Sequence, residues 1–190
     1  MDNQQERLSE IEIAWLAGIV DGEGCINIYI QKKVNRCGNK KFQIVPRITI
    51  VNTDEKIIEK CYYLLHEKFG PYIQRQKRKG IMRKDSLVIN IHGWKRCKKV
   101  CDLLHEFLVG DKKESSKILS EWAEHRINCY NNGYSRKEDS SYTVEDAEYY
   151  FKLKSISGRI LNDYTLKAIC EATGLDKIPS LRYSLAINES

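Results

Sequence analysis

The sequence predicts an α+β protein in which helices back one face of a four-stranded antiparallel sheet. Three observations lead to this prediction. The hydrophobic pattern starts with the spacing of a helix, then alternates with the two-residue period of strands, and this succession occurs twice before two further helices. Each pair of alternating segments is joined by a short, glycine-containing polar stretch, as in a hairpin. The expected order is α-β-β-α-β-β-α-α.

The first helix is marked at both ends. Ser9 and Glu12 have the spacing of a capping box, and Gly22 and Gly24 end the helix. Its apolar stripe consists of Ile11, Trp15, Leu16, Ile19 and Val20.

The first hairpin follows directly. Cys25–Lys33 and Phe42–Val51 both alternate between isoleucine and polar residues, and the Gly38-Asn39 pair marks the loop between them. Because proline cannot donate to a strand ladder, Pro46 predicts that the return strand is partly unpaired or bulged.

The remaining elements show the same signals. The expected segments are a helix from Thr53 to Phe69, strands Tyr72–Lys77 and Ser86–His92, and helices near Trp94–Phe107 and Lys113–Asn131. Beyond them, 131–142 has the polar composition of a linker, and Thr143–Lys154 and Tyr164–Ala172 are expected to be short helices. We therefore divide the chain into a domain over 1–131 and a linker with a small helical C-terminal extension over 132–190.

Composition favours a folded protein with a basic surface. The 190 residues carry a net charge of +6, with both signs mixed along the chain. Such a balance indicates nucleic acid as a partner before acidic proteins or an anionic membrane. No apolar run approaches the roughly 18 residues of a membrane span, so no membrane association is expected. Seven cysteines without a C-x-x-C pair favour reduced thiols in an intracellular compartment.

One segment breaks a local rule. It reads Leu16-Ala17-Gly18-Ile19-Val20-Asp21-Gly22-Glu23-Gly24. Two small residues would let another backbone approach the helix closely. The helix then ends in two carboxylates, although a helix C-terminus is already electronegative. A divalent cation would resolve this conflict. On the pattern alone, an ordinary amphipathic helix with a glycine stop and exposed acids remains an alternative.

These nine residues are similar to the motif of the LAGLIDADG homing endonucleases. The differences are conservative, with Gly22 in place of alanine and Glu23 in place of the second aspartate. The α-β-β-α-β-β-α core of that family also resembles the order expected from about Ser9 to Trp122.

The resemblance implies a metal-dependent DNA endonuclease. In this family two motif helices pack along their small faces, and the terminal carboxylates hold divalent metal between the scissile phosphates. By position, the metal ligand is Glu23 with the backbone at Gly22. The implied ion is Mg²⁺, with Mn²⁺ or Ca²⁺ able to replace it for binding.

Secondary catalytic positions follow from the same resemblance. Asn52 corresponds to a polar residue that orients the attacking water, and Lys56 to a basic residue just inside the next helix. A lysine that stabilises the transition state corresponds to Lys112 or Lys113, and the sequence leaves that choice open.

Since the sequence contains one clear motif, the resemblance implies a homodimer on a pseudo-palindromic site of double-stranded DNA. The predicted dimer interface consists of Trp15, Ala17, Gly18 and Asp21. We expect Asp21 to cap the partner's helix end or to support the interface.

Strand alternation predicts the DNA-reading face. Amide, arginine and aromatic side chains on a twisted sheet can read base edges in the major groove, and the basic second hairpin can contact phosphates. The predicted contacts are Asn27, Tyr29, Gln31, Lys33, Gln43, Arg47, Thr49, Gln74, Arg75, Gln76, Lys77, Arg78, Ser86, Val88 and Asn90. The predicted core face is Ile26, Ile28, Ile30, Ile44, Ile48, Ile50, Ile73, Leu87, Ile89 and Ile91. Two alternatives share the fold: an RNA-splicing maturase and a sequence-specific DNA-binding protein that does not cleave.

Overall fold

A computed structural model of the chain describes residues 8–34, 40–77, 84–131, 142–158 and 161–174. The elements are α1 (Glu10–Glu23), β1 (Gly24–Val34), β2 (Lys40–Asn52), α2 (Glu55–Phe69), β3 (Tyr72–Gln76), β4 (Ser86–His92), α3 (Trp94–Leu104), α4 (Gly110–Asn131), α5 (Val144–Ile156) and α6 (Asp163–Thr173). Their order and class confirm the predicted α+β fold. The capping box of α1 is also confirmed, since the Ser9 hydroxyl accepts from the Glu12 backbone N–H and the Glu12 carboxylate accepts from the Ser9 backbone N–H.

The four strands form one antiparallel sheet in the order β1-β2-β4-β3. β1 pairs with β2 along its whole length, with Pro46 opposite Ile28 and no bulge. β4 pairs with β2 only from Arg47 to Asn52, so β2 is unpaired on that side from Lys40 to Pro46. The prediction of partial pairing is confirmed, and the alternative of a bulge is wrong. From Lys40 to Pro46, β2 pairs with β1 alone, and the two strands form a two-stranded ribbon.

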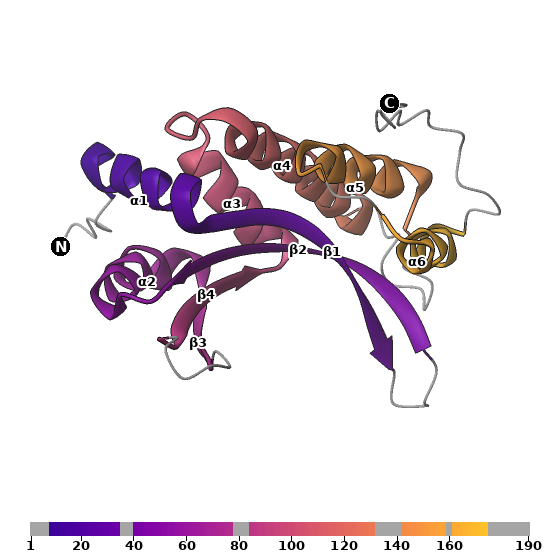
Figure 1. Cartoon of the computed structure of the whole chain (residues 1–190). Helices are drawn as coiled ribbons and strands as arrows, with labels where there is room; N and C mark the ends of the chain where they lie inside the picture. Colours follow the sequence, from indigo (N-terminus) through magenta and orange to yellow (C-terminus); the bar gives the residue numbers. More distant parts are fainter. Residues whose placement is uncertain (1–7, 35–39, 78–83, 132–141, 159–160, 175–190) are drawn as a thin grey trace, which may run out of the picture.

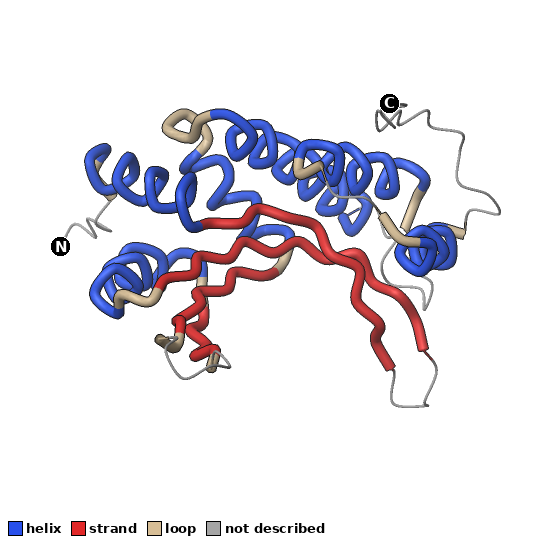
Figure 2. Tube along the Cα trace, viewed as in Figure 1, coloured by secondary structure: helices blue, strands red, loops and turns tan. Residues whose placement is uncertain are grey.

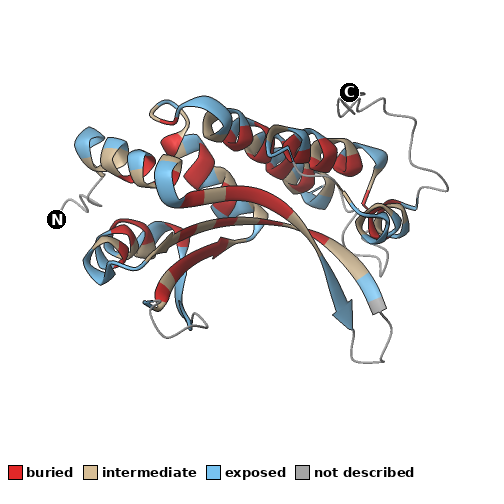
Figure 3. Cartoon of the chain, in the orientation of Figure 1, coloured by how far each residue is buried: buried red, intermediate tan, exposed pale blue. Residues whose placement is uncertain are grey.

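The sheet is arched, and helices lie over one side of it (Figures 1 and 2). α1, α3 and α4 lie over the convex side, while the concave side faces away from them. We call this concave side the arched face. The β1–β2 ribbon and the β3–β4 hairpin curve down on either side of it. Along β1, burial gives way to exposure toward the end of the ribbon (Figure 3).

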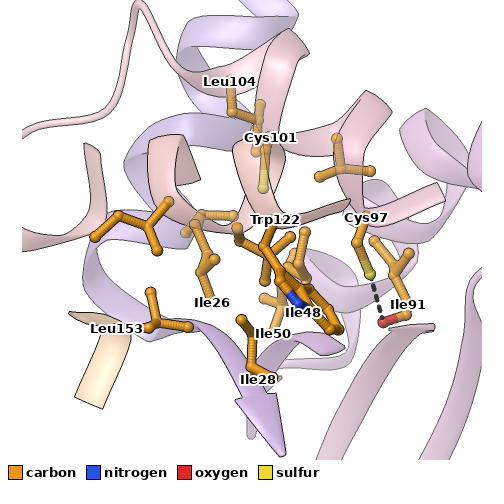
Figure 4. Packing of buried hydrophobic residues seen from close by; sticks show 14 of the residues in the cluster. Ile26, Ile28, Ile48, Ile50, Ile91, Cys97, Cys101, Leu104, Trp122 and Leu153 are labelled. Atoms are coloured by element: carbon orange, nitrogen blue, oxygen red, sulfur yellow. Dashed lines mark hydrogen bonds between the residues drawn. The ribbon is translucent and has the colours of Figure 1, made fainter. Parts of the chain in front are cut away.

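The core lies between the helices and the convex side of the sheet. Trp122 of α4 is fully buried among the isoleucines of β1 and β2 and residues of α3 (Figure 4). Nearly all of the predicted core face is confirmed, with Ile30 and Leu87 only partly buried. Ile73 is the exception, because it is 41% exposed. It lies on β3, the short edge strand whose residues are all exposed.

The cysteines behave as small apolar residues. Cys61, Cys97 and Cys101 are buried in the core, and the described cysteines are all free. Burial raises the pKa of the Cys61 thiol to about 11 and that of Cys97 to about 12. Thiols with such pKa values carry almost no reactive thiolate near neutral pH.

The described part of the C-terminal extension, residues 142–158 and 161–174, packs on the rest of the chain. Asp146 of α5 is fully buried and accepts from the indole N–H of Trp122 at 2.7 Å and from Arg126 at 3.0 Å. The Tyr142 hydroxyl donates to the Ile44 carbonyl of β2 at 3.0 Å. The extension thus shares the hydrophobic core with the first domain. The boundary at residue 131 stays a prediction.

Candidate active site and sheet interface

The end of α1 places Glu23 at a junction between helix and strand. Glu23 is the last residue of α1 and is exposed, and β1 begins at the next residue. A side chain at position 24 would put its Cβ 2.6 Å from the Val20 carbonyl oxygen. Glycine is therefore required for the chain to pass directly from the helix into the sheet, and this passage holds the Glu23 carboxylate at the sheet end nearest α1.

Asp21 makes a contact within its own chain that the sequence did not predict. Its carboxylate accepts from the backbone N–H of Val109, at 3.2 Å for the nearer oxygen. Val109 directly precedes α4, so Asp21 supplies the capping acceptor for the start of a helix in its own chain. That Asp21 also caps the partner's helix end or supports the dimer interface stays a prediction. The segment before α4 folds back onto the end of α1, which sequence spacing does not reveal.

The structure distinguishes the two candidate lysines. The Lys112 ammonium donates to the carbonyl oxygen of Gly24, the residue directly after Glu23. Lys113 instead points toward Glu106, with its ammonium 4.0 Å from that carboxylate. Lys112 therefore belongs to the candidate site, and Lys113 does not contact it.

Asn52 and Lys56 lie where β2 leads into α2. Gly24 pairs with Ile50, so Asn52 lies two positions further along β2, toward the end of α1. The Asn52 side-chain oxygen accepts from the Asp54 backbone N–H at 2.9 Å, which is a helix-start role. This bond uses only the side-chain oxygen, so the Asn52 amide nitrogen can still donate to a ligand. Lys56 is exposed and lines an open polar hollow of about 640 Å³ with Asp54 and Glu59.

One side of α1 is uncovered. Ile11 is 82% exposed, and Ala14, Gly18 and Gly22 are exposed on the same side at spacings of three and four residues. We call these four residues the outward face of α1; it is pale blue in Figure 3. A Cβ added at Gly18 or Gly22 would meet nothing within 4 Å. Another backbone can therefore approach α1 closely here.

The interface predicted on α1 is thus partly wrong. Ala17 is fully buried within the chain and cannot contact a partner. Trp15 is half-buried, with the Lys60 ammonium 4.2 Å from its ring centre. Gly18 lies on the outward face. Ile11, Ala14 and Gly22 lie on the outward face with Gly18 but were not among the predicted interface residues, although their spacing of three and four residues places them on one side of the helix.

Most predicted sheet contacts are accessible. Gln31, Lys33, Gln74, Arg75, Gln76 and Lys77 are exposed, and Tyr29, Gln43, Arg47 and Thr49 are partly buried. Arg75 is ion-paired with Glu55 of α2 at 2.7 Å. Arg78 lies outside the described residues.

Four predicted contacts are buried and need correction. Asn27, Val88 and Asn90 are each 4% exposed, and Ser86 is fully buried. β4 runs between β2 and β3, whose side chains flank it, and Asn27 is covered by Lys154 of α5. Ser86 and Asn90 differ from the other two, because the Ser86 hydroxyl and the Asn90 amide nitrogen have no hydrogen-bond partner among the described residues.

The arched face also holds a group of aromatic and basic side chains. The Arg47 guanidinium lies 3.9 Å from the ring centre of Tyr29. On the neighbouring strands, His92 of β4 stacks on Tyr72 of β3, and the Tyr72 hydroxyl lies 2.9 Å from His92 Nε2. Burial and the nearby Arg47 charge lower the pKa of His92, which favours the neutral imidazole. His92 and Tyr72 were not among the predicted contacts, although each continues the alternation of its strand on this face.

The described residues of a single chain do not form a complete metal site. Among the described residues, no group of three or more His, Cys, Asp or Glu side chains is placed to hold an ion. Mg²⁺ is commonly held by one or two carboxylates together with substrate phosphates. An exposed Glu23 fits this pattern if a second carboxylate and phosphate oxygens supply the other ligands.

The described helices include none long and apolar enough to cross a membrane.

Comparisons with known proteins agree with this geometry. The family model described as LAGLIDADG endonuclease matches residues 16–123. The homing endonuclease I-CvuI, solved with the I-CreI target and Mg and with the DNA not cleaved, is 17% identical (87% of this chain, 94% of that chain, TM-score 0.61). The archaeal intron-encoded homing endonuclease I-Vdi141I, solved with DNA, is 14% identical, and the match covers 88% of this chain and 98% of that chain with a TM-score of 0.61. The group I intron-encoded homing endonuclease I-CeuI, solved with DNA, is 16% identical, and the match covers 90% of this chain and 78% of that chain with a TM-score of 0.55. These structural likenesses show the fold. No curated protein matched the sequence.

Proposed function

The chain belongs to the LAGLIDADG endonuclease family, and we propose that it is a homodimeric, metal-dependent endonuclease that cleaves both strands of a long, pseudo-palindromic DNA site. The observation that carries the proposal is the position of Glu23. This exposed carboxylate ends α1 next to the outward face, at the edge of an arched sheet with basic and amide side chains. The solved relatives I-CvuI, I-CeuI and I-Vdi141I were crystallised with DNA, which supports a DNA substrate.

Dimerisation would complete the site. If two copies of α1 pack along their outward faces, two-fold symmetry brings the two Glu23 carboxylates close to the axis. Each copy then presents its arched face to one half of the DNA. The Glu23 carboxylate of one chain would thereby gain the second carboxylate that a divalent ion needs.

The residues of this chain divide the chemistry of phosphodiester hydrolysis among them. When bound, Mg²⁺ supplies charge neutralisation at the phosphate and a water of lowered pKa. Glu23 would hold the ion, with the Gly22 backbone as an additional ligand. Asn52 would orient the attacking water through its amide nitrogen, and the Lys112 ammonium would stabilise negative charge as it develops on the phosphate. Lys56 would contribute a positive charge at the edge of the site.

Lys112 and Lys113 provide a matched pair for testing this assignment. We expect Lys112→Met to lower the single-turnover cleavage rate by about 10²-fold, because it removes a charge that acts on the transition state. Lys113→Met should change the rate by less than about threefold, because the exposed ion pair with Glu106 that it removes contributes little free energy. Rates measured on the same target at saturating protein compare the two. Equal losses in both variants would contradict the assignment.

The proposed function is tested by incubating the protein with a randomised double-stranded DNA library in Mg²⁺ or Ca²⁺ and sequencing the cleaved ends. Cutting at one long, roughly two-fold-symmetric site in Mg²⁺ is the expected result. Selection of a DNA site without cutting in either ion would favour a non-cleaving DNA-binding protein. Failure to select DNA at all would overturn the proposal and make an RNA-splicing role the next hypothesis.

A further inference from the structure

Lys154 is a buried cation that reaches the sheet from the C-terminal extension. It lies on α5, is 6% exposed, and its ammonium donates to the side-chain oxygen of Asn27 on β1 at 2.6 Å. Burying a lysine is unfavourable unless polar groups compensate. A leucine or methionine would fill this position at less cost, so the charge calls for an explanation beyond packing.

The ammonium lies among aromatic rings. It is 5.1 Å from the ring centre of Tyr29 and 4.9 Å from that of Tyr150. The Tyr29 ring is also in contact with the Arg47 guanidinium, at 3.9 Å from ring centre to Cζ. Asn27 and Arg47 are direct cross-strand partners. A continuous set of contacts therefore runs from Lys154 through Asn27 and Tyr29 to Arg47.

Arg47 is the member of this set that can read a base by donating two hydrogen bonds. It is partly exposed on the arched face, and its Nε has no hydrogen-bond partner among the described residues. A guanidinium reads guanine by donating two parallel hydrogen bonds, so the plane of the group must be fixed. Contact with the Tyr29 ring supplies this restriction, because a stacked guanidinium has fewer accessible rotamers.

We propose that Lys154 is a positioning residue for sequence specificity. It holds the Tyr29 ring and the Asn27 side chain in place, and Tyr29 in turn orients Arg47 toward a guanine edge. The C-terminal extension therefore takes part in selecting the DNA sequence, in addition to its packing role. This inference rests on the proposed function, since it requires that the arched face binds DNA.

The variant Lys154→Met separates this role from folding. It keeps an unbranched apolar side chain and removes only the ammonium. The Asn27 oxygen keeps a donor, because the Ile28 backbone N–H already donates to it at 2.8 Å. Methionine also keeps the buried aliphatic part of the lysine side chain, and the fold is expected to survive. Lys152→Met, an exposed position two residues earlier on α5, is the matched control.

The test compares base preferences by selection from a randomised double-stranded DNA library in Ca²⁺. The proteins are the wild type, Lys154→Met, Lys152→Met, Arg47→Ala and the double variant of Lys154 and Arg47. We expect Lys154→Met to lower the preference for guanine at the position read by Arg47 by about tenfold, within the range of one bidentate contact. Preferences elsewhere should stay unchanged. In the Arg47→Ala background, Lys154→Met should have no further effect.

Tyr29→Leu is a second route to the same result and is expected to cause the same local loss. A uniform weakening at all positions, or an equal effect of Lys154→Met with and without Arg47, would overturn the inference while leaving the proposed function intact. If the wild type selects no DNA, the proposed function fails, and the inference fails with it.

Discussion

Glu23→Gln is expected to lower the rate of DNA cleavage by on the order of 10³-fold or more, because it removes the carboxylate that would hold the divalent ion at the scissile phosphates. Glutamine keeps the length and polarity of the side chain, so the end of α1 should be unchanged. Glu23 is exposed, and its side chain forms no hydrogen bond or ion pair with the described residues that the fold would lose. Binding of the target in Ca²⁺ should therefore stay within a few-fold of wild type, which gel-shift titration can measure alongside single-turnover cleavage.

Glu10→Gln is the matched control for this experiment. Glu10 is also exposed and lies at the other end of α1, so the same change of charge occurs far from the proposed site. It should leave the cleavage rate unchanged. Retention of full cleavage by Glu23→Gln would remove Glu23 from the reaction and leave the two-carboxylate site without a basis.

The elements of the fold were predictable because their signals are local. The capping box at Ser9, the alternation of Ile44, Ile48 and Ile50, and the polar turn segments each specify structure within a few residues. The observed bounds differ from the predicted ones mainly at the helix ends. For example, α4 begins at Gly110 rather than near Lys113, since Asp21 caps it from a distant part of the chain.

The side-chain environments were less predictable because they depend on contacts between distant segments. Alternation placed Asn27 and Val88 correctly opposite the core face but could not show that they are buried there. The burial of Asn27 depends on Lys154, which is 127 positions away in sequence. The choice between Lys112 and Lys113 likewise depends on how the start of α4 lies against Gly24. Both cases require the folded arrangement, which no local pattern encodes.

The outward face of α1 explains why the site residues of one chain are insufficient. Its glycines are not required by the fold of the single chain, because a Cβ at Gly18 or Gly22 would meet open space and both residues lie in regular helix. Glycine within a helix costs about 1 kcal/mol relative to alanine. A partner that packs closely against this face would account for that cost.

Gly18→Leu is therefore expected to give a folded chain that neither dimerises nor cleaves DNA. Within one chain the substitution favours the helix, so the melting temperature of the monomer should not fall. In a two-fold dimer the added side chain is present twice at the closest approach, and overpacking of about 1–3 kcal/mol per copy would weaken the dimer by roughly 10²-fold or more. Sedimentation would measure the loss of dimer, and cleavage of the target should fall with it. Glu121→Leu, which adds the same side chain at an exposed position on α4, should remain dimeric and active. A Gly18→Leu protein that still dimerises and cleaves would show that α1 does not form the interface, and the pairing of two Glu23 carboxylates would then have to be abandoned.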